Sequence, residues 1–271
     1  MKIAAILPAY NEAARVASVA RVVVRCPSID EVIVVNDGST DNTADVVRAI
    51  PGVRLVNLPK NLGKGGAMTA GVAATNAKLL VFLDADLIGL RCEHVESLIE
   101  PVRTGKYQMA VGRFRGGRKL TDWAQRLTPN ISGQRAIRRD VFVQIPDLVT
   151  ARYGVEMAIT RYCHRWRVPS LTVWITGVTH PMKEEKLGFL RGLLSRAKMY
   201  FQILDTLLDP REPRRVRARR PVAQIPRFLK TLAANQRRQG RPKSTMYWLY
   251  RQERSWHRRR GQSRAHWRFK K

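Results

Sequence analysis

The chain has 271 residues, and 44% of them are hydrophobic, which is enough to build a substantial core and excludes disorder throughout. The 50 Lys and Arg residues outnumber the 21 Asp and Glu residues, and the resulting net charge of +29 indicates an anionic partner. Three scattered Cys residues without a CxxC pair argue against a disulfide framework or a zinc knuckle, and no apolar run suits a signal peptide or a membrane span, so we expect a cytoplasmic protein.

The first hundred residues alternate apolar runs typical of buried strands with amphipathic runs typical of helices. The expected strands are 2–7, 31–35, 53–56 and 78–83, followed by 107–111 and 171–175. The expected helices are 12–24, 41–50, 64–75 and 153–163. We expect the second helix to be opened by Ser39-Thr40-Asp41, whose side chains accept hydrogen bonds from free helix amides. This alternation predicts an α/β fold with a parallel sheet and right-handed crossovers.

The polar clusters of the amino-terminal half fall at the ends of predicted strands. They are residues 8–12, 36–43, 61–67 and 84–86. Parallel sheets bind ligands at the carboxyl ends of their strands, so this arrangement predicts one binding crevice. In the last cluster, Asp84 and Asp86 can hold a divalent cation that neutralises a diphosphate, because Mg²⁺ prefers a few carboxylates together with phosphate oxygens. The simpler alternative is a turn with two solvated acids.

Taken in order, these clusters resemble the nucleotide-sugar motifs of family 2 glycosyltransferases. The motifs are Pro8-Ala9-Tyr10-Asn11-Glu12, Asn36-Asp37-Gly38-Ser39-Thr40-Asp41, Gly63-Lys64-Gly65-Gly66-Ala67 and Asp84-Ala85-Asp86. The resemblance covers roughly residues 1–185 and implies the GT-A fold, a Rossmann-like, mostly parallel sheet flanked by helices. One departure is Asn36, where the family usually has Asp.

The resemblance also implies roles for these residues toward a nucleotide-diphosphate sugar. It implies Pro8, Tyr10 and Glu12 beside the nucleotide, and Asp37 on its base. Lys64 is implied near base or phosphate, Asp84 toward the ribose, and Asp86 on a Mg²⁺ or Mn²⁺ ion.

Residues 112–180 resemble acceptor-side motifs of two branches of this family. The segment 132–139 is similar to polyprenyl-phosphate sugar transferases, whereas Gly112-Arg113, Gly154-Val155-Glu156 and Thr179-His180 are similar to glucosyl-3-phosphoglycerate synthases. Both branches use a phosphorylated acceptor, and Arg side chains bind phosphate bidentately. Arg113, Arg135 and Arg138, together with Arg139, are therefore candidate acceptor-binding residues.

Two further residues are candidates for the reacting centre. In the second branch the matching histidine completes the metal shell, so the resemblance makes His180 a third metal ligand beside Asp86. An exposed loop histidine is the alternative. Glu156 is, with Asp86, a candidate catalytic residue, and a structural carboxylate that pairs with Arg135 or Arg138 is the alternative.

The carboxyl-terminal third differs in composition from the rest. We expect a domain of residues 1–185, an amphipathic helix over 186–210 and an Arg-rich extension over 211–271, which holds 21 basic and 2 acidic residues. The helix can lie on a membrane or dock on the sheet domain. The extension can anchor the chain to an anionic membrane, bind nucleic acid, or be a disordered solubilising tail.

These observations predict a glycosyltransferase that moves a sugar from a nucleotide-diphosphate sugar to a phosphorylated acceptor. A polyprenyl phosphate at the cytoplasmic face of a membrane is the first candidate acceptor. A soluble enzyme similar to glucosyl-3-phosphoglycerate synthase is one alternative, and a nucleic-acid-binding protein that acts through its basic tail is the other.

Overall fold

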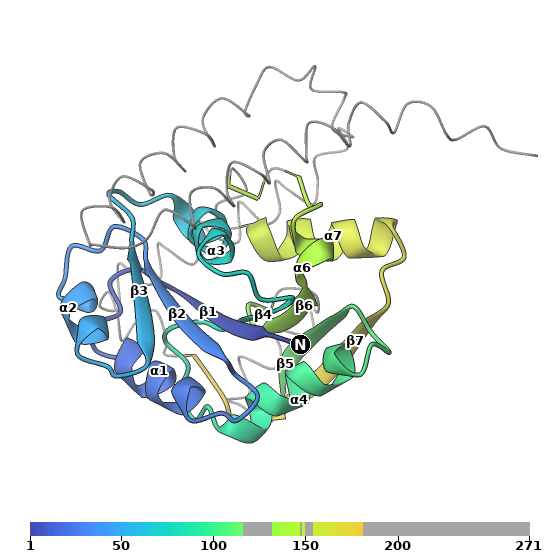
Figure 1. The fold of residues 1–271 in the computed structure, drawn as a ribbon, viewed down its shortest axis with the longest axis horizontal. Coiled ribbons are helices and arrows are strands. Elements are labelled where there is room, and N and C mark those ends of the chain that lie inside the picture. The colour runs from blue at the N-terminus through green and yellow to red at the C-terminus, as the bar shows by residue number, and fades with distance from the viewer. Residues whose placement is uncertain (116–131, 147, 150–153, 181–271) are drawn as a thin grey trace, which may run out of the picture. The chain divides into compact units, whose positions relative to one another are not determined.

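The structure, a computed structural model, describes residues 1–115, 132–146, 148–149 and 154–180 (Figure 1). Its strands form one seven-stranded sheet in the order β3-β2-β1-β4-β6-β5-β7. The strands are β1 (Ile3–Ala9), β2 (Glu31–Asn36), β3 (Val53–Asn57), β4 (Leu79–Phe82), β5 (Met109–Arg115), β6 (Arg135–Arg138) and β7 (Ser170–Thr176). The helices are α1 (Val16–Val24), α2 (Thr43–Arg48), α3 (Gly63–Ala73), α4 (Cys92–Arg103), α6 (Arg139–Phe142) and α7 (Val155–Arg165).

The sheet is mixed because one strand runs against all the others. β1, β2, β3 and β4 pair in parallel, and β5 pairs in parallel with β7. β6 lies between β4 and β5 and is antiparallel to both. Because β6 is antiparallel to both neighbours, β5 and β7 run in the same direction as β1 to β4. The carboxyl ends of these six strands therefore meet at one edge, together with the amino end of β6. We call this the carboxyl edge of the sheet.

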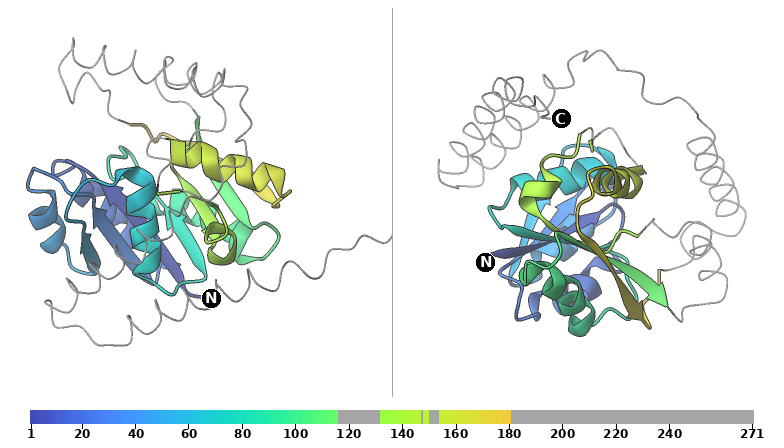
Figure 2. Two further views of the ribbon diagram at one scale, coloured as in Figure 1. Left: turned by 90° about the horizontal axis from the view of Figure 1, so that it is seen from above. Right: turned by 90° about the vertical axis from the view of Figure 1, so that its right-hand side faces the viewer.

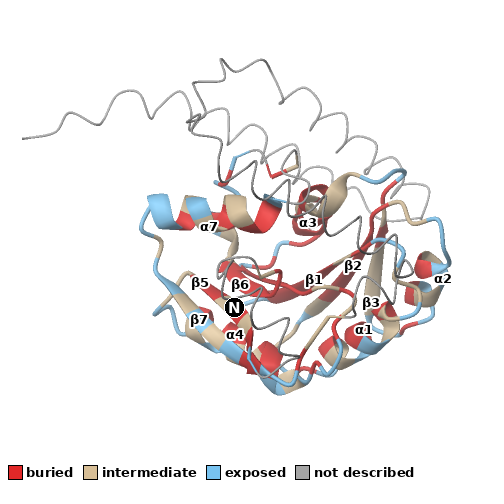
Figure 3. Ribbon diagram, turned by 180° about the vertical axis from the view of Figure 1, so that it is seen from behind, coloured by how far each residue is buried: buried red, intermediate tan, exposed pale blue. Residues whose placement is uncertain are grey.

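Helices cover both faces of the sheet, as Figures 1 and 2 show. α1, α2 and α4 lie on one face, and α3, α6 and α7 lie on the other. The central strands between them are buried (Figure 3). On the first face, Val16, Val19, Ala20 and Val23 of α1 form one buried stripe at helical spacing and pack in the main apolar cluster with alternate residues of β1.

Small residues allow α3 to approach the opposite face closely. Gly71 faces β1 and β2, where a Cβ atom on it would collide with the Ile6 side chain and lie 3.1 Å from Val35 Cγ2. A Cβ atom on Gly65 would likewise collide with the backbone carbonyl oxygen of Leu148. The glycine-rich segment therefore brings the helix that carries Lys64 against the sheet.

The six expected strands and four expected helices are present, with ends shifted by a few residues. The second helix begins later than expected, at Thr43, and Asp41 Oδ1 accepts the Thr43 amide at 3.0 Å. Three elements, α4, α6 and β6, are not among those expected from the sequence. β6 is only four residues long and has Arg at both ends, so its composition carries little strand signal.

The carboxyl-terminal predictions lie outside the described residues. These are the helix over 186–210 and the Arg-rich extension over 211–271. Within the part of the chain that the structure describes, no helix is both long enough and apolar enough to span a bilayer.

Candidate active site

The loops after β1 and β2 are hydrogen-bonded to each other at the carboxyl edge. The Asn11 amide donates to Ser39 Oγ at 2.9 Å, and Asn11 Oδ1 accepts the Thr40 amide at 2.9 Å. Asn11 has a φ of 55°, a left-handed conformation that Asn tolerates better than most residues. One residue on, the Glu12 amide donates to Thr43 Oγ1 at 2.9 Å. These bonds hold the segment that carries Tyr10 and Glu12, with the Tyr10 side chain exposed.

Asp37 is buried at the end of β2 and faces the start of α3. Its Oδ1 atom accepts the Leu62 amide at 2.8 Å. Burial raises the pKa of the Asp37 carboxyl to about 6, against the opposing effect of the amides of Leu62 and Gly63. Asp37 therefore has a structural role, because it satisfies free amide groups at the amino end of the helix. Asn36, the departure from the family pattern, orders the same turn by accepting the Ser39 amide at 3.1 Å.

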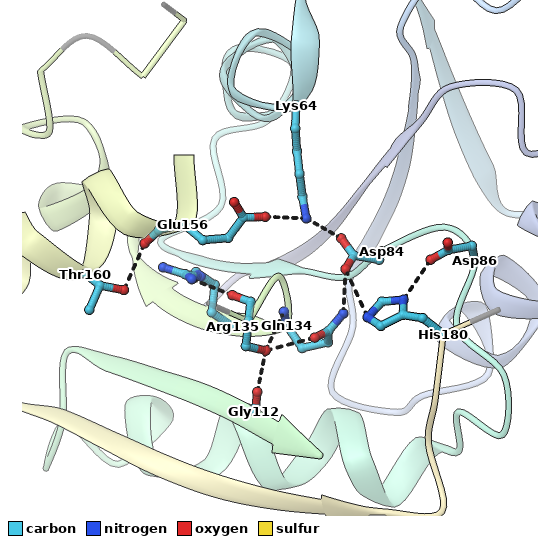
Figure 4. Close-up of polar contacts among 10 residues, drawn as sticks. Lys64, Asp84, Asp86, Gly112, Gln134, Arg135, Glu156, Thr160 and His180 are labelled. Carbon is cyan, nitrogen blue, oxygen red and sulfur yellow. Dashed lines mark hydrogen bonds and ion pairs between the residues drawn. The ribbon is translucent and has the colours of Figure 1, made fainter. Parts of the chain in front are cut away.

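Lys64 lies between two carboxylates at the centre of the site. Its Nζ atom is 2.5 Å from Asp84 Oδ1 and 2.5 Å from Glu156 Oε1 (Figure 4). Burial alone would lower the pKa of Lys64, but the charges of Asp84 and Glu156 outweigh it and raise the pKa. The ammonium group joins α3, the end of β4 and the first turn of α7. Among the described ion pairs, Glu156 binds Lys64 and neither Arg135 nor Arg138, the two partners that the structural alternative named.

The segment before β6 packs closely on this ion pair. Gln134 Nε2 donates to Asp84 Oδ2 at 2.8 Å, and Ser132 Oγ donates to Gln134 Oε1 at 2.9 Å. Gly133 lies over the pair, and a Cβ atom there would be 2.5 Å from Asp84 Oδ2 and 2.6 Å from Lys64 Nζ. A side chain at this position would therefore displace the two charged groups from where they lie here.

Asp84, Asp86 and His180 form a cluster of candidate metal ligands. Each offers one oxygen or nitrogen atom, and these atoms lie within 4.8 Å of one another. His180 Nδ1 is 3.0 Å from Asp86 Oδ1, and its Nε2 is 3.6 Å from Asp84 Oδ2 (Figure 4). Burial alone would lower the pKa of His180, but its hydrogen bond to Asp86 and the two carboxylate charges outweigh burial and raise it. Two carboxylates and an imidazole suit Mg²⁺ or Mn²⁺.

Bonds between distant segments bring His180 into this cluster. Ile88 and Thr179 form an antiparallel bridge, which sets the residues after β7 beside the loop of Asp86. The His180 ring also packs edge-on against Phe114 of β5, with centroids 5.3 Å apart. His180 is therefore a partly buried member of the site, and the exposed loop histidine that we kept as the alternative is wrong.

The predicted arginines lie in very different places. Arg113 is at the carboxyl edge, where its guanidinium lies 5.1 Å from the centre of the Trp174 ring. Arg135 is completely buried, donates to the Ser132 carbonyl at 2.5 Å and lies beside Glu156 (Figure 4). Because β6 is reversed, Arg138 pairs with Leu79 at the opposite edge, where Asp140 binds it at 3.1 Å. Arg139 donates to the Val72 carbonyl.

These positions correct the expectation that all four arginines bind the acceptor. The structure brings Arg113 to the carboxyl edge but not Arg138 or Arg139, and it gives Arg135 no surface on which to bind a ligand bidentately. Pro8 is half-buried within β1, opposite Val35, and precedes the loop of residues 10–12 that is hydrogen-bonded to the loop after β2.

Three residues of this region, Gln134, Gly133 and Trp174, were not among the candidates from the sequence. Gly133 and Gln134 lie inside the segment 132–139, whose similarity to polyprenyl-phosphate sugar transferases could have pointed to them. For Trp174, the signal was its place on the polar side of a strand whose other side carries Val173 and Ile175.

Residues 4–160, more than half of the chain, match the sequence profile of glycosyl transferase family 2. The chain belongs to this family. The fold is the GT-A fold that the motifs led us to expect. It is similar to the crystal structure of glucosyl-3-phosphoglycerate synthase from Mycobacterium tuberculosis in complex with Mn²⁺, uridine diphosphate and glucosyl-3-phosphoglycerate. That similarity has a TM-score of 0.57 and 30% identity, over 72% of this chain and 79% of the other.

Two curated relatives represent the two branches noted in the sequence. A dolichyl-phosphate beta-glucosyltransferase of Trichomonas vaginalis is 43% identical to this family 2 chain over 94 residues, which are 30% of the chain and 28% of the relative. The Mycobacterium tuberculosis glucosyl-3-phosphoglycerate synthase is 31% identical over 195 residues, which are 58% of the chain and 59% of the relative. The chain thus spans less than two thirds of the length of these curated relatives.

Proposed function

We propose that this chain is a metal-dependent glycosyltransferase that moves a sugar from a nucleotide-diphosphate sugar to a phosphorylated acceptor. The observation that carries the proposal is the cluster of Asp84, Asp86 and His180 at the carboxyl edge, next to the ammonium group of Lys64. Similar proteins support it, because structures of glucosyl-3-phosphoglycerate synthase contain uridine diphosphate with Mn²⁺ or Mg²⁺.

Asp86 and His180 would hold a Mg²⁺ or Mn²⁺ ion, with Asp84 as the third candidate ligand. Their donor atoms are oxygen and nitrogen, and their side chains are only partly buried, so a ligand can reach them. When bound, such an ion neutralises the diphosphate and stabilises it as a leaving group.

The other residues of the site would bind and orient the donor. Lys64 adds positive charge beside Asp84, where a diphosphate would lie, and Asp37 and the 10–12 loop flank the nucleotide side. In the reaction, the bond from the anomeric carbon to the diphosphate breaks, and a bond to an acceptor oxygen forms. A phosphate acceptor is already ionised at neutral pH and attacks without a strong base. Glu156, held by Lys64, flanks this centre.

A polyprenyl phosphate is the first candidate acceptor, supported by the similarity to dolichyl-phosphate beta-glucosyltransferase and by the basic extension. The second is 3-phosphoglycerate, supported by the longer match to glucosyl-3-phosphoglycerate synthase. This acceptor would attack through a hydroxyl group, so a base would have to remove its proton. Transfer from radiolabelled nucleotide sugars separates the two, because a prenyl-linked product partitions into butanol and a glycerate product into water.

The proposal is tested by Asp86→Asn. We expect this variant to keep its fold and to lose at least about a hundredfold of its Mn²⁺-dependent binding of uridine diphosphate and of its turnover, because one metal ligand is removed. Calorimetric titration with and without Mn²⁺ measures binding. The matched control is Asp45→Asn in α2, whose exposed carboxylate pairs only with Arg48 in the described contacts. Undiminished metal-dependent binding and turnover in Asp86→Asn would refute the metal site.

A further inference from the structure

An exposed tryptophan lies on the edge strand of the sheet beside two arginines. Trp174 of β7 is 53% exposed, although a large aromatic ring is usually buried or in contact with a partner. The Arg113 guanidinium lies 5.1 Å from the centre of its ring, and that of Arg115 lies 6.0 Å from it. Both distances are within the range of cation–π attraction. We call these three side chains the Trp174 shelf.

Strand register places the shelf on the same face of the sheet as Glu156 and Arg135. Arg135 is opposite Val111, and Arg113 follows Val111 by two residues on β5, so the two arginines share a face. Arg113 is in turn opposite Trp174. Ala110, Phe114 and Ile175, which alternate with these residues along the two strands, lie in the apolar cluster on the other face.

The shelf is also at the carboxyl edge, where Arg113 and Arg115 lie on β5, two strands from β4, and Trp174 lies on β7, six residues before His180. Gln134, which binds Asp84, accepts the Gly112 amide on its carbonyl at 2.8 Å, and Arg113 follows Gly112. Lys64 and the two aspartates lie on the β4 side of the Gly112–Gln134 hydrogen bond. A phosphate bound at Arg113 would therefore lie beside the reaction centre but outside the place expected for the donor diphosphate.

We propose that the Trp174 shelf binds the phosphate monoester of the acceptor and that Trp174 is the positioning residue that holds the two guanidinium groups for it. This inference rests on the proposed function. A guanidinium stacked on an indole is already held in place and therefore loses less conformational freedom when an anion binds. An unsupported Arg side chain would have to be ordered by the ligand itself. A prenyl phosphate and 3-phosphoglycerate both offer the phosphate group that the shelf recognises.

The test compares Trp174→Ala and Trp174→Phe with the wild-type full chain. We expect Trp174→Ala to raise the KM for the acceptor roughly tenfold while the donor KM and kcat change less than about twofold. Phe also presents an aromatic face, so Trp174→Phe should stay within about threefold of the wild-type acceptor KM. The assay uses a short water-soluble prenyl phosphate in one arm and 3-phosphoglycerate in the other, which identifies the source of the phosphate.

The matched control is Trp166→Ala. Trp166 is 65% exposed, but it lies just past the far end of α7, ten residues from Glu156 and about 15 Å along the helix axis. Its ring packs against Tyr162, and no aromatic or cation–π contact between described residues joins it to the shelf. We expect its acceptor KM to be unchanged.

A binding measurement separates this inference from the proposed function. With uridine diphosphate and Mn²⁺ present, 3-phosphoglycerate or the prenyl phosphate should change the tryptophan emission of wild type and of Trp166→Phe but not that of Trp174→Phe. This titration needs no turnover, so it remains decisive even if no sugar transfer is found. An unchanged acceptor KM in Trp174→Ala would overturn the proposal. Equal increases in the donor KM and the acceptor KM, together with a lower thermal stability, would overturn it as well.

Discussion

At the residue scale, Asp37 is a carboxylate whose burial and hydrogen bonding have opposite effects on its charge. It accepts the Leu62 amide just before α3, yet burial raises its pKa to about 6 from an ordinary value of 3.8. Between about pH 4 and 6 the folded protein therefore keeps a proton that the unfolded chain has released, and stability falls as the pH rises through this range. A charged form kept at such a cost is consistent with a carboxylate needed for ligand binding.

Asp37→Asn should remove this pH dependence. Its side-chain oxygen can still accept the Leu62 amide, and the buried charge is gone, so we expect the free energy of unfolding at pH 7.5 to rise by up to about 3 kcal/mol relative to wild type. At pH 3.5 the two proteins should differ little. Urea denaturation at both pH values measures this, with Asp45→Asn as the exposed control. A variant less stable than wild type at pH 7.5 would contradict the assignment.

At the element scale, α3 links the core to the site because its buried glycines set the position of Lys64. Gly71→Ala would force a methyl group against Ile6 and Val35, both fully buried. We expect a loss of about 1–3 kcal/mol in the free energy of unfolding, larger than the gain of about 1 kcal/mol from the better helix propensity of Ala.

A matched glycine provides the control for this substitution. Gly154 precedes α7 with a φ of −97°, and a Cβ atom there would meet nothing within 4 Å. Gly154→Ala should therefore change stability by about 0.5 kcal/mol or less. Equal melting temperatures for wild type and Gly71→Ala would show that α3 can shift away from β1 without cost.

At the scale of the whole molecule, positive charge is concentrated outside the described residues. The extension over 211–271 carries a net +19, whereas the motifs assigned to the donor and the acceptor all lie before residue 181. Deleting 211–271 should abolish salt-sensitive binding to vesicles that contain anionic lipid and change turnover of a water-soluble acceptor less than about twofold. Vesicle flotation at low and high salt measures the first effect, and initial rates measure the second.

A parallel experiment tests the other interpretation of the extension. A gel-shift assay with single-stranded nucleic acid reports whether the basic residues and Trp248, Trp256 and Trp267 bind phosphate and stack on bases. Full-length protein that shifts nucleic acid but ignores anionic vesicles would reject the membrane role. Vesicle binding that persists without residues 211–271 would reject it equally.

Local patterns along the chain predicted the alternation of strands and helices, the order of the motifs and the carboxylates of the Asp84-Ala85-Asp86 turn. These features follow from local periodicity and turn chemistry, which each segment carries within a few residues. The same local information placed Lys64 at the start of a helix and His180 after a strand.

Which of these residues lie next to one another depends on the arrangement of the whole fold. The reversal of β6 sends Arg135 and Arg138 to opposite edges, although they are three residues apart, and hides the first beneath Glu156. Asp86 and His180 meet across 94 residues, and Trp174 meets Arg113 across a strand pair. Strand order, direction and register depend on burial summed over the whole sheet, so no local pattern encodes them.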